Sequence, residues 1–234
     1  MKVDRAIIIR RLGVSESLEY AQMCADSCDK YGVPYEFLDG VEFMNSEDAI
    51  KSVGAWLHPE NVRKKVSQGN NCCHASHIKS WRRIVEIGKP CLILEHDTFV
   101  KGDVCNIEIP DMTVVTFGHR IAHPDWYNPP NSITELIKIE TQSGAHAYAV
   151  SPKTAQWLID DAVTNGVNIN VDEWLNLRCG LPLYVAEPPQ VVCWPRMSTR
   201  EWIKPEEKRL SPGSSWSFAS SNTPGWTKGF KVVE

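Results

Sequence analysis

The residues most suited to chemistry are two carboxylates at the end of an apolar run. Residues 90–97 read Pro-Cys-Leu-Ile-Leu-Glu-His-Asp. A short apolar run between breakers predicts a buried strand, so Glu95 and Asp97 follow its C-terminal end, where open α/β sheets bind ligands. Side chains alternate along a strand, which directs these two acids to one side and His96 to the other. Paired carboxylates suit a hard divalent cation bound to a diphosphate. The alternative is a surface loop with two solvated acids.

The elements that must position these acids alternate between strands and helices. Apolar runs predict strands over residues 5–10, 35–38, 90–95, 112–117, 147–151 and 183–186. Amphipathic or capped segments predict helices over 18–30 (capped by Ser15 or Ser17), after Ser46 (itself the predicted cap), over 73–87 and 152–163, and from Asp172. Residues 64–71 and 119–131 are predicted loops. The β-α-β order predicts a mostly parallel central sheet flanked by helices.

The composition indicates one soluble α/β domain over residues 1–192 with an irregular, Trp-rich segment over 193–234 that packs on the same domain. The net charge of −4 predicts no general affinity for nucleic acid, although a local basic groove stays open. Eight cysteines without zinc-type spacing indicate a reducing compartment. The chain has no membrane-spanning run and no signal-peptide pattern at its N-terminus, which predicts a cytoplasmic protein.

Four segments, in order, resemble the motifs of one enzyme family. Residues 73–86 resemble C-x-x-S-H-x-x-x-W-x-x-I-V-E, and residues 92–97 resemble L-I-L-E-D-D. Residues 144–151 resemble G-T-H-A-Y-x-x-S, and residues 170–172 resemble P-V-D. Together they resemble glycosyltransferase family 25, which includes lipopolysaccharide sugar transferases and collagen galactosyltransferases. The chain departs from the family pattern at His96, where the family usually has aspartate.

The resemblance implies a GT-A fold and an inverting transfer from a nucleotide-sugar donor, usually a UDP-sugar. It also implies Mn²⁺ (or Mg²⁺), held by Asp97 and Glu95, which neutralises the diphosphate as it leaves. An inverting transfer needs a base for the acceptor hydroxyl. Asp172 and Glu173 are the candidates, and the alternative for Asp172 is a helix N-cap.

Six residues are predicted to bind the donor through the resemblance and through their places after strands or in the motif helix. They are Arg10, Asp39, Ser76, His77, Glu95 and His146. Structural roles stay open for three of them: His77 and His146 as buried hydrogen-bonding residues, and Asp39 as a turn residue. Trp81 is predicted to lie in the core.

The acceptor is predicted to be a surface glycan such as lipopolysaccharide. A hydroxymethylated DNA base, as in phage-type DNA glycosyltransferases, is the second hypothesis, because aromatic and basic residues are interleaved in the tail. A protein hydroxyl is the third. The remaining alternative is an inactive glycosyltransferase-like binding module. The oligomeric state does not follow from the sequence.

Overall fold

The structure, a computed structural model, describes residues 1–120, 125, 127–129, 134–141, 144–177, 180–194, 197 and 231–232. The strands are β1 Arg5–Arg10, β2 Tyr35–Asp39, β3 Cys91–Glu95, β4 Thr98–Val100, β5 Val114–Thr116, β6 Gly118–Arg120, β7 Glu135–Thr141, β8 Ala147–Val150, β9 Leu183–Glu187, β10 Val191–Cys193 and β11 Lys231–Val232. The helices are α1 Ser15–Lys30, α2 Ser46–Ser52, α3 Pro59–Arg63, α4 Gln68–Ile87, α5 Pro152–Asn165 and α6 Val171–Leu177.

The strands form one large sheet and one small sheet. The large sheet has eight strands in the order β11-β7-β9-β5-β8-β3-β1-β2, and the small sheet has the order β4-β10-β6. Strands β1, β2 and β3 are parallel, and β5 is parallel to β9. Strand β8 runs antiparallel between β3 and β5. The predicted α/β class with a mostly parallel sheet flanked by helices is therefore confirmed.

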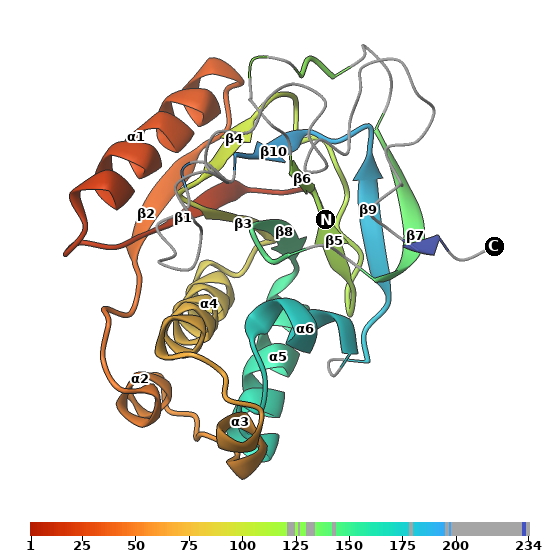
Figure 1. Cartoon of the computed structure of the whole chain (residues 1–234). Coiled ribbons are helices and arrows are strands. Elements are labelled where there is room, and N and C mark those ends of the chain that lie inside the picture. The colour runs from red at the N-terminus through yellow and green to blue at the C-terminus, as the bar shows by residue number, and fades with distance from the viewer. Residues whose placement is uncertain are drawn as a thin grey trace.

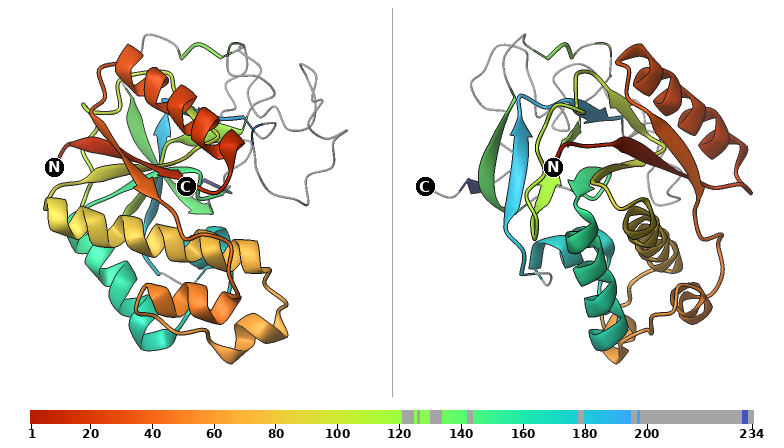
Figure 2. Two further views of the ribbon diagram at one scale, coloured as in Figure 1. Left: turned by 90° about the vertical axis from the view of Figure 1, so that its left-hand side faces the viewer. Right: turned by 180° about the vertical axis from the view of Figure 1, so that it is seen from behind.

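Helices cover both faces of the large sheet (Figure 1). Helix α1 lies on one face, and α2 to α6 lie on the other, as the side and rear views in Figure 2 also show. Strand β3 contributes side chains to the core on both faces of the sheet. Leu92 and Leu94 pack beneath α1, whereas Cys91 and Ile93 pack beneath α4 and α5. A strand buried on both faces needs the continuous apolar run that the sequence shows.

Helix α4 carries the first motif and is longer than predicted. The predicted loop over residues 64–71 is wrong in its second half, because Ser67 caps a helix that begins at Gln68. Ser67 Oγ accepts the N–H of Asn70, which satisfies a backbone group that the helix leaves unpaired. Gly88, with φ of 71°, ends the helix in the left-handed conformation, as predicted.

Two predicted helix caps are wrong. Val14, not Ser15 or Ser17, precedes α1, and Ser17 Oγ instead accepts the N–H of Arg11 at 2.9 Å. Asn45, not Ser46, caps α2 by accepting the N–H of Asp48. Helix α3 and strands β4, β6, β7, β10 and β11 were not predicted.

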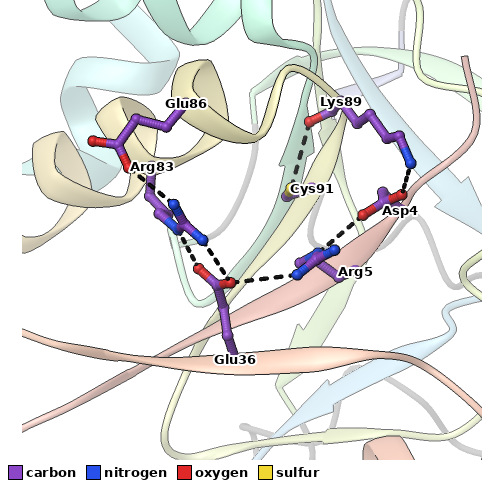
Figure 3. Close-up of polar contacts among 7 residues, drawn as sticks. All are labelled: Asp4, Arg5, Glu36, Arg83, Glu86, Lys89 and Cys91. Atoms are coloured by element: carbon purple, nitrogen blue, oxygen red, sulfur yellow. Dashed lines mark hydrogen bonds and ion pairs between the residues drawn. The ribbon is translucent and has the colours of Figure 1, made fainter.

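Ion pairs connect β1, β2 and α4 near the start of the strands (Figure 3). Glu36 of β2 contacts Arg83 of α4 at 2.6 Å and Arg5 of β1 at 3.5 Å. Asp4 continues the network by pairing with Arg5 and Lys89. The network lies at the N-terminal end of the parallel strands, so it supports the fold away from the carboxylates at the other end.

The end of the chain returns to both sheets. Strand β10 lies between β4 and β6, and β11 pairs with β7. Trp194 packs against Phe99, with ring centroids 6.4 Å apart. Trp202, Trp216 and Trp226 of the predicted Trp-rich segment lie outside the described residues, as does Trp126. Among the helices described here, none has the length and apolar character needed to cross a membrane.

Candidate functional site

The predicted site residues come together mainly at the edge where β1, β2, β3, β5 and β9 end. Arg10, Asp39 and Glu95 are the last residues of β1, β2 and β3. Arg10 Nε lies 2.8 Å from Asp39 Oδ1, so these two residues pair with each other. The pair continues the alternation of Ile8 and Phe37 and therefore lies on the face covered by α1. Glu95 continues the alternation of Ile93 and lies on the α4 face.

Ser76 supports the loop that follows β2. Its Oγ accepts the N–H of Val41 at 2.8 Å and donates to the carbonyl oxygen of Cys72 at 2.8 Å. The side chain is buried. A Cβ on Gly40 would lie only 3.0 Å from this hydroxyl oxygen, so the loop approaches α4 closely. Ser76 thus holds the end of β2 against the motif helix.

A buried chain of hydrogen bonds runs from Trp81 to Glu95. Trp81 Nε1 lies 2.8 Å from the hydroxyl oxygen of Tyr148, and that oxygen lies 2.9 Å from His77 Nδ1. His77 Nε2 then lies 3.4 Å from Glu95 Oε1. Trp81, His77 and Tyr148 are fully buried, which confirms Trp81 as a core residue.

The directions of these hydrogen bonds follow from the groups involved. The indole N–H only donates, so the Tyr148 oxygen accepts from Trp81 and its own proton goes to His77 Nδ1. Burial holds the pKa of Tyr148 well above its usual value, so the hydroxyl keeps that proton. His77 then carries its proton on Nε2 and donates it to Glu95. We assign this tautomer from the hydrogen-bond network. The chain orients Glu95 from the helix side.

Cys73 joins His77 and Glu95 in a compact group of potential metal ligands. Cys73 Sγ lies 3.5 Å from Glu95 Oε1, and the three donor atoms lie within 4.8 Å of one another. Cys73 and His77 are four residues apart and share a face of α4. A thiol, an imidazole and a carboxylate suit Zn²⁺ better than Mn²⁺. In the hydrogen-bonded arrangement, however, His77 Nε2 carries a proton and donates it to Glu95, so this nitrogen has no lone pair for a metal ion.

The turn from β3 into β4 places His96 and Asp97. The His96 ring stacks on Tyr20 of α1 with centroids 6.3 Å apart, on the face opposite Glu95, as alternation predicts. Asp97 is buried, and its carbonyl oxygen accepts the N–H of Trp194. Thr98 Oγ1 donates to the carbonyl oxygen of Glu95 at 2.7 Å, which closes the turn.

His146 lies beside Glu95 at the start of β8. The backbone N–H of Glu95 donates to the carbonyl oxygen of His146 at 2.9 Å. The His146 side chain is buried against Gly118, where an added Cβ would lie 2.6 Å from the imidazole. Gly118 therefore leaves the space that the ring occupies.

The two predicted bases differ in their surroundings. Asp172 Oδ1 accepts the N–H of Ala145 at 3.0 Å, which ties α6 to the segment before His146. Glu173 is exposed, and its N–H donates to Asn170 Oδ1. Asn170, not Asp172, therefore caps α6, and the side-chain amide of Asn170 donates to Glu173 Oε1 at 3.3 Å.

Sequence reasoning missed Tyr148 and Cys73 as members of the site. Tyr148 lies in a quoted motif, and its hydroxyl contacts two residues of α4. Cys73 begins another motif, one helical turn before His77. Both have a sequence signal in the motifs, but their contacts with the site depend on how β8 and α4 pack.

Part of the chain is similar to a known protein family. Residues 15–109 match the model of glycosyltransferase family 25 (LPS biosynthesis protein), which confirms the resemblance found in the sequence and supports glycosyltransferase activity. The matched residues include Glu95, Asp97 and the motif helix. No curated protein matches the chain.

One of the similar solved structures is a distant relative in sequence. It is titled a crystal structure of a glycosyltransferase involved in the glycosylation of the major capsid of PBCV-1. The TM-score is 0.41 at 10% identity, over 80% of this chain and 92% of that chain. This likeness is too distant to assign the role of any residue.

Proposed function

We propose that this protein is a metal-dependent, inverting glycosyltransferase that moves a sugar from a UDP-sugar to a glycan hydroxyl, such as one on lipopolysaccharide. The observation that carries the proposal is Glu95, which is partly exposed at the end of β3 and oriented by the buried chain through His77. It lies within the segment that matches the family model. The glycan acceptor rests on the family description alone.

The proposed metal is Mn²⁺, with Mg²⁺ as the alternative. Glu95 and Asp97 supply the carboxylate oxygens that these ions prefer, on either side of His96. Their donor chemistry therefore fits such an ion. When bound, the ion would neutralise the charge that develops on the departing diphosphate. His77 and Ser76 support this site from the protein interior, because both side chains are buried and hydrogen-bonded within the protein.

The donor half of the proposal is tested by nucleotide release. The protein is incubated with UDP-glucose, UDP-galactose or UDP-N-acetylglucosamine, with Mn²⁺ or with a chelator, and UDP is measured. Release with at least one donor, lost on chelation and in Glu95→Ala, supports the proposal. Without any nucleotide-sugar binding or hydrolysis in either condition, the protein is a binding module instead.

The acceptor half is tested with one donor and a panel of acceptors. Lipopolysaccharide fragments, a hydroxylysine peptide and DNA containing hydroxymethylcytosine are offered separately, and the labelled sugar is followed by mass spectrometry. Transfer to the glycan alone is expected. Transfer to the DNA or to the peptide would replace the glycan assignment while leaving the donor site intact.

A further inference from the structure

Glu187 is a carboxylate at the same sheet edge that neither the motifs nor the metal site uses. It is the last residue of β9, which runs parallel to β5. Leu183 and Val185 of β9 pack in the core on the α4 face. Glu187 continues their alternation, so it lies on the same face as Glu95.

The residues between Glu95 and Glu187 form a row along this edge. His146 follows Glu95, joined by a backbone hydrogen bond of 2.9 Å, and Gly118 lies against the His146 ring. Thr116, the last residue of β5, is in register with Val185 of β9, two residues before Glu187. Gly118 begins β6 and is in register with Val191 of β10, four residues after Glu187. The sheet order β9-β5-β8-β3 separates Glu187 from Glu95 by three strand spacings, about 14 Å in all.

The distance between Glu95 and Glu187 leaves room for both substrates of a glycosyl transfer. A diphosphate bound near Glu95 would place the donor sugar over His146 and Gly118, the middle of the row. The acceptor hydroxyl would then approach from the side of Glu187. The row thus separates the leaving group from the attacking group, as an in-line displacement requires.

The surroundings of Glu187 suit proton transfer near neutral pH. Burial raises the pKa of Glu187 to about 7. Its Oε2 is buried and accepts no hydrogen bond within the part of the chain that the structure describes. Among the described residues, the titratable groups beside it are exposed Glu135, its register partner on β7, and Tyr127. The pKa of Tyr127 is raised chiefly by burial and also by the charge of Glu187. A base is most effective when its pKa lies near the working pH.

We infer that Glu187 is the catalytic base that takes the proton from the acceptor hydroxyl, an inference that rests on the proposed glycosyltransferase function. As the O–H bond breaks, its proton passes to the Glu187 carboxylate and the acceptor oxygen forms a bond to the sugar's anomeric carbon. The bond from that carbon to the diphosphate breaks, and the nucleoside diphosphate leaves with the electron pair. Asp172 is then a positioning residue, because it holds Ala145 beside His146.

The test uses water as the acceptor, so it does not depend on the identity of the glycan. UDP release from the three UDP-sugars is measured with Mn²⁺ from about pH 5.5 to 9 in wild type, Glu187→Gln and Glu135→Gln. In wild type, kcat should rise about tenfold from one pH unit below the base's pKa to the plateau. Glu187→Gln should lower kcat by about 10²–10⁴-fold, remove this rise and leave the donor KM unchanged. Glu135→Gln should keep the wild-type profile.

A second measurement keeps the inference testable if Glu187→Gln does not fold. The carboxyl carbons of ¹³C-labelled glutamate are titrated by NMR in wild type and in Glu187→Asp, and a glutamate signal titrating near neutral pH should be missing from the variant. An unchanged kcat and pH profile in folded Glu187→Gln would overturn the inference, as would the absence of that signal from wild type. Loss of the pH rise in Asp172→Asn alone would also overturn it. If wild type releases no UDP from any donor, the proposed function itself fails and the role of Glu187 fails with it.

Discussion

The hydroxyl of Tyr148 holds the buried chain together, so Tyr148→Phe tests the site's internal support. The variant keeps the ring and removes one oxygen that contacts Trp81 at 2.8 Å and His77 at 2.9 Å. Both partners are fully buried, so each loses a hydrogen bond that water cannot replace. A buried polar group left unsatisfied costs about 1–3 kcal/mol, which gives about 2–6 kcal/mol for the pair.

Thermal or urea unfolding measures this loss, and Tyr184→Phe is the matched control. For a chain of this size, each kcal/mol lowers Tm by about 2–4 °C, so Tyr148→Phe should melt roughly 10 °C below wild type. Tyr184 is half-buried on β9, and none of the described residues hydrogen-bonds its hydroxyl. Its variant should stay within about 0.5 kcal/mol of wild type.

The same variant reports on the His77 tautomer. Nitrogen-15 NMR of the histidine rings should show His77 protonated on Nε2 in wild type, and this preference should weaken in Tyr148→Phe. The reasoning is refuted if Tyr148→Phe is as stable as the control, or if wild-type His77 carries its proton on Nδ1.

Three further predictions address other parts of the account. Gly118→Ala places a Cβ 2.6 Å from the His146 imidazole and should destabilise the protein by about 1–3 kcal/mol in a thermal melt; an unchanged Tm would contradict the close approach. The pKa of Glu36 is lowered chiefly by its hydrogen bond to Arg83, so its stabilisation is present above the ordinary carboxyl pKa and is lost as pH falls through the lowered value. Glu36→Gln should therefore cost about 0.5–1 kcal/mol at pH 7, because partial exposure to solvent weakens the pair. In urea titrations it should cost almost nothing once the pH has fallen below the lowered pKa of Glu36. Asp97→Ala should abolish Mn²⁺-dependent UDP binding in calorimetry, and unchanged binding would remove Asp97 from the site.

Local signals were sufficient for the strand and helix that carry the first motifs. The apolar run before Glu95 predicts β3 because a strand covered on both faces must be apolar throughout. Gly88 marks the end of α4 because its positive φ suits glycine. The alternation that separates His96 from Glu95 also needs only the chain's local geometry.

Other features have only weak local signals or depend on contacts between distant segments. Helix α4 begins at Gln68 in a polar stretch, where the capping hydroxyl of Ser67 outweighs the weak helix preference of Gly69, Asn70 and Asn71. The strands of the small sheet are too short to show periodicity, and β10 joins β4 and β6 from far along the chain.

The site shows the same limit. Tyr148 contacts His77 across 71 positions of sequence, and Glu187 reaches this edge of the sheet only through the pairing of β5 and β9. The half-burial that raises the pKa of Glu187 is also a property of the folded chain. A sequence motif can therefore indicate Glu95, but not the buried residues that orient it or the second carboxylate, Glu187, on the same edge of the sheet.

Proton NMR of the donor follows the sugar's anomeric proton during the reaction, so it reports both the cleavage of the nucleotide sugar and the stereochemistry of the product. With Mn²⁺ and a UDP-sugar that the protein accepts, the donor's α-anomeric signal should disappear as UDP appears. The released or transferred sugar should first appear as the β-anomer. Glu95→Ala should leave the donor intact. If wild type leaves every UDP-sugar unchanged, with and without Mn²⁺, the assignment of a nucleotide-sugar site to this sheet edge is contradicted.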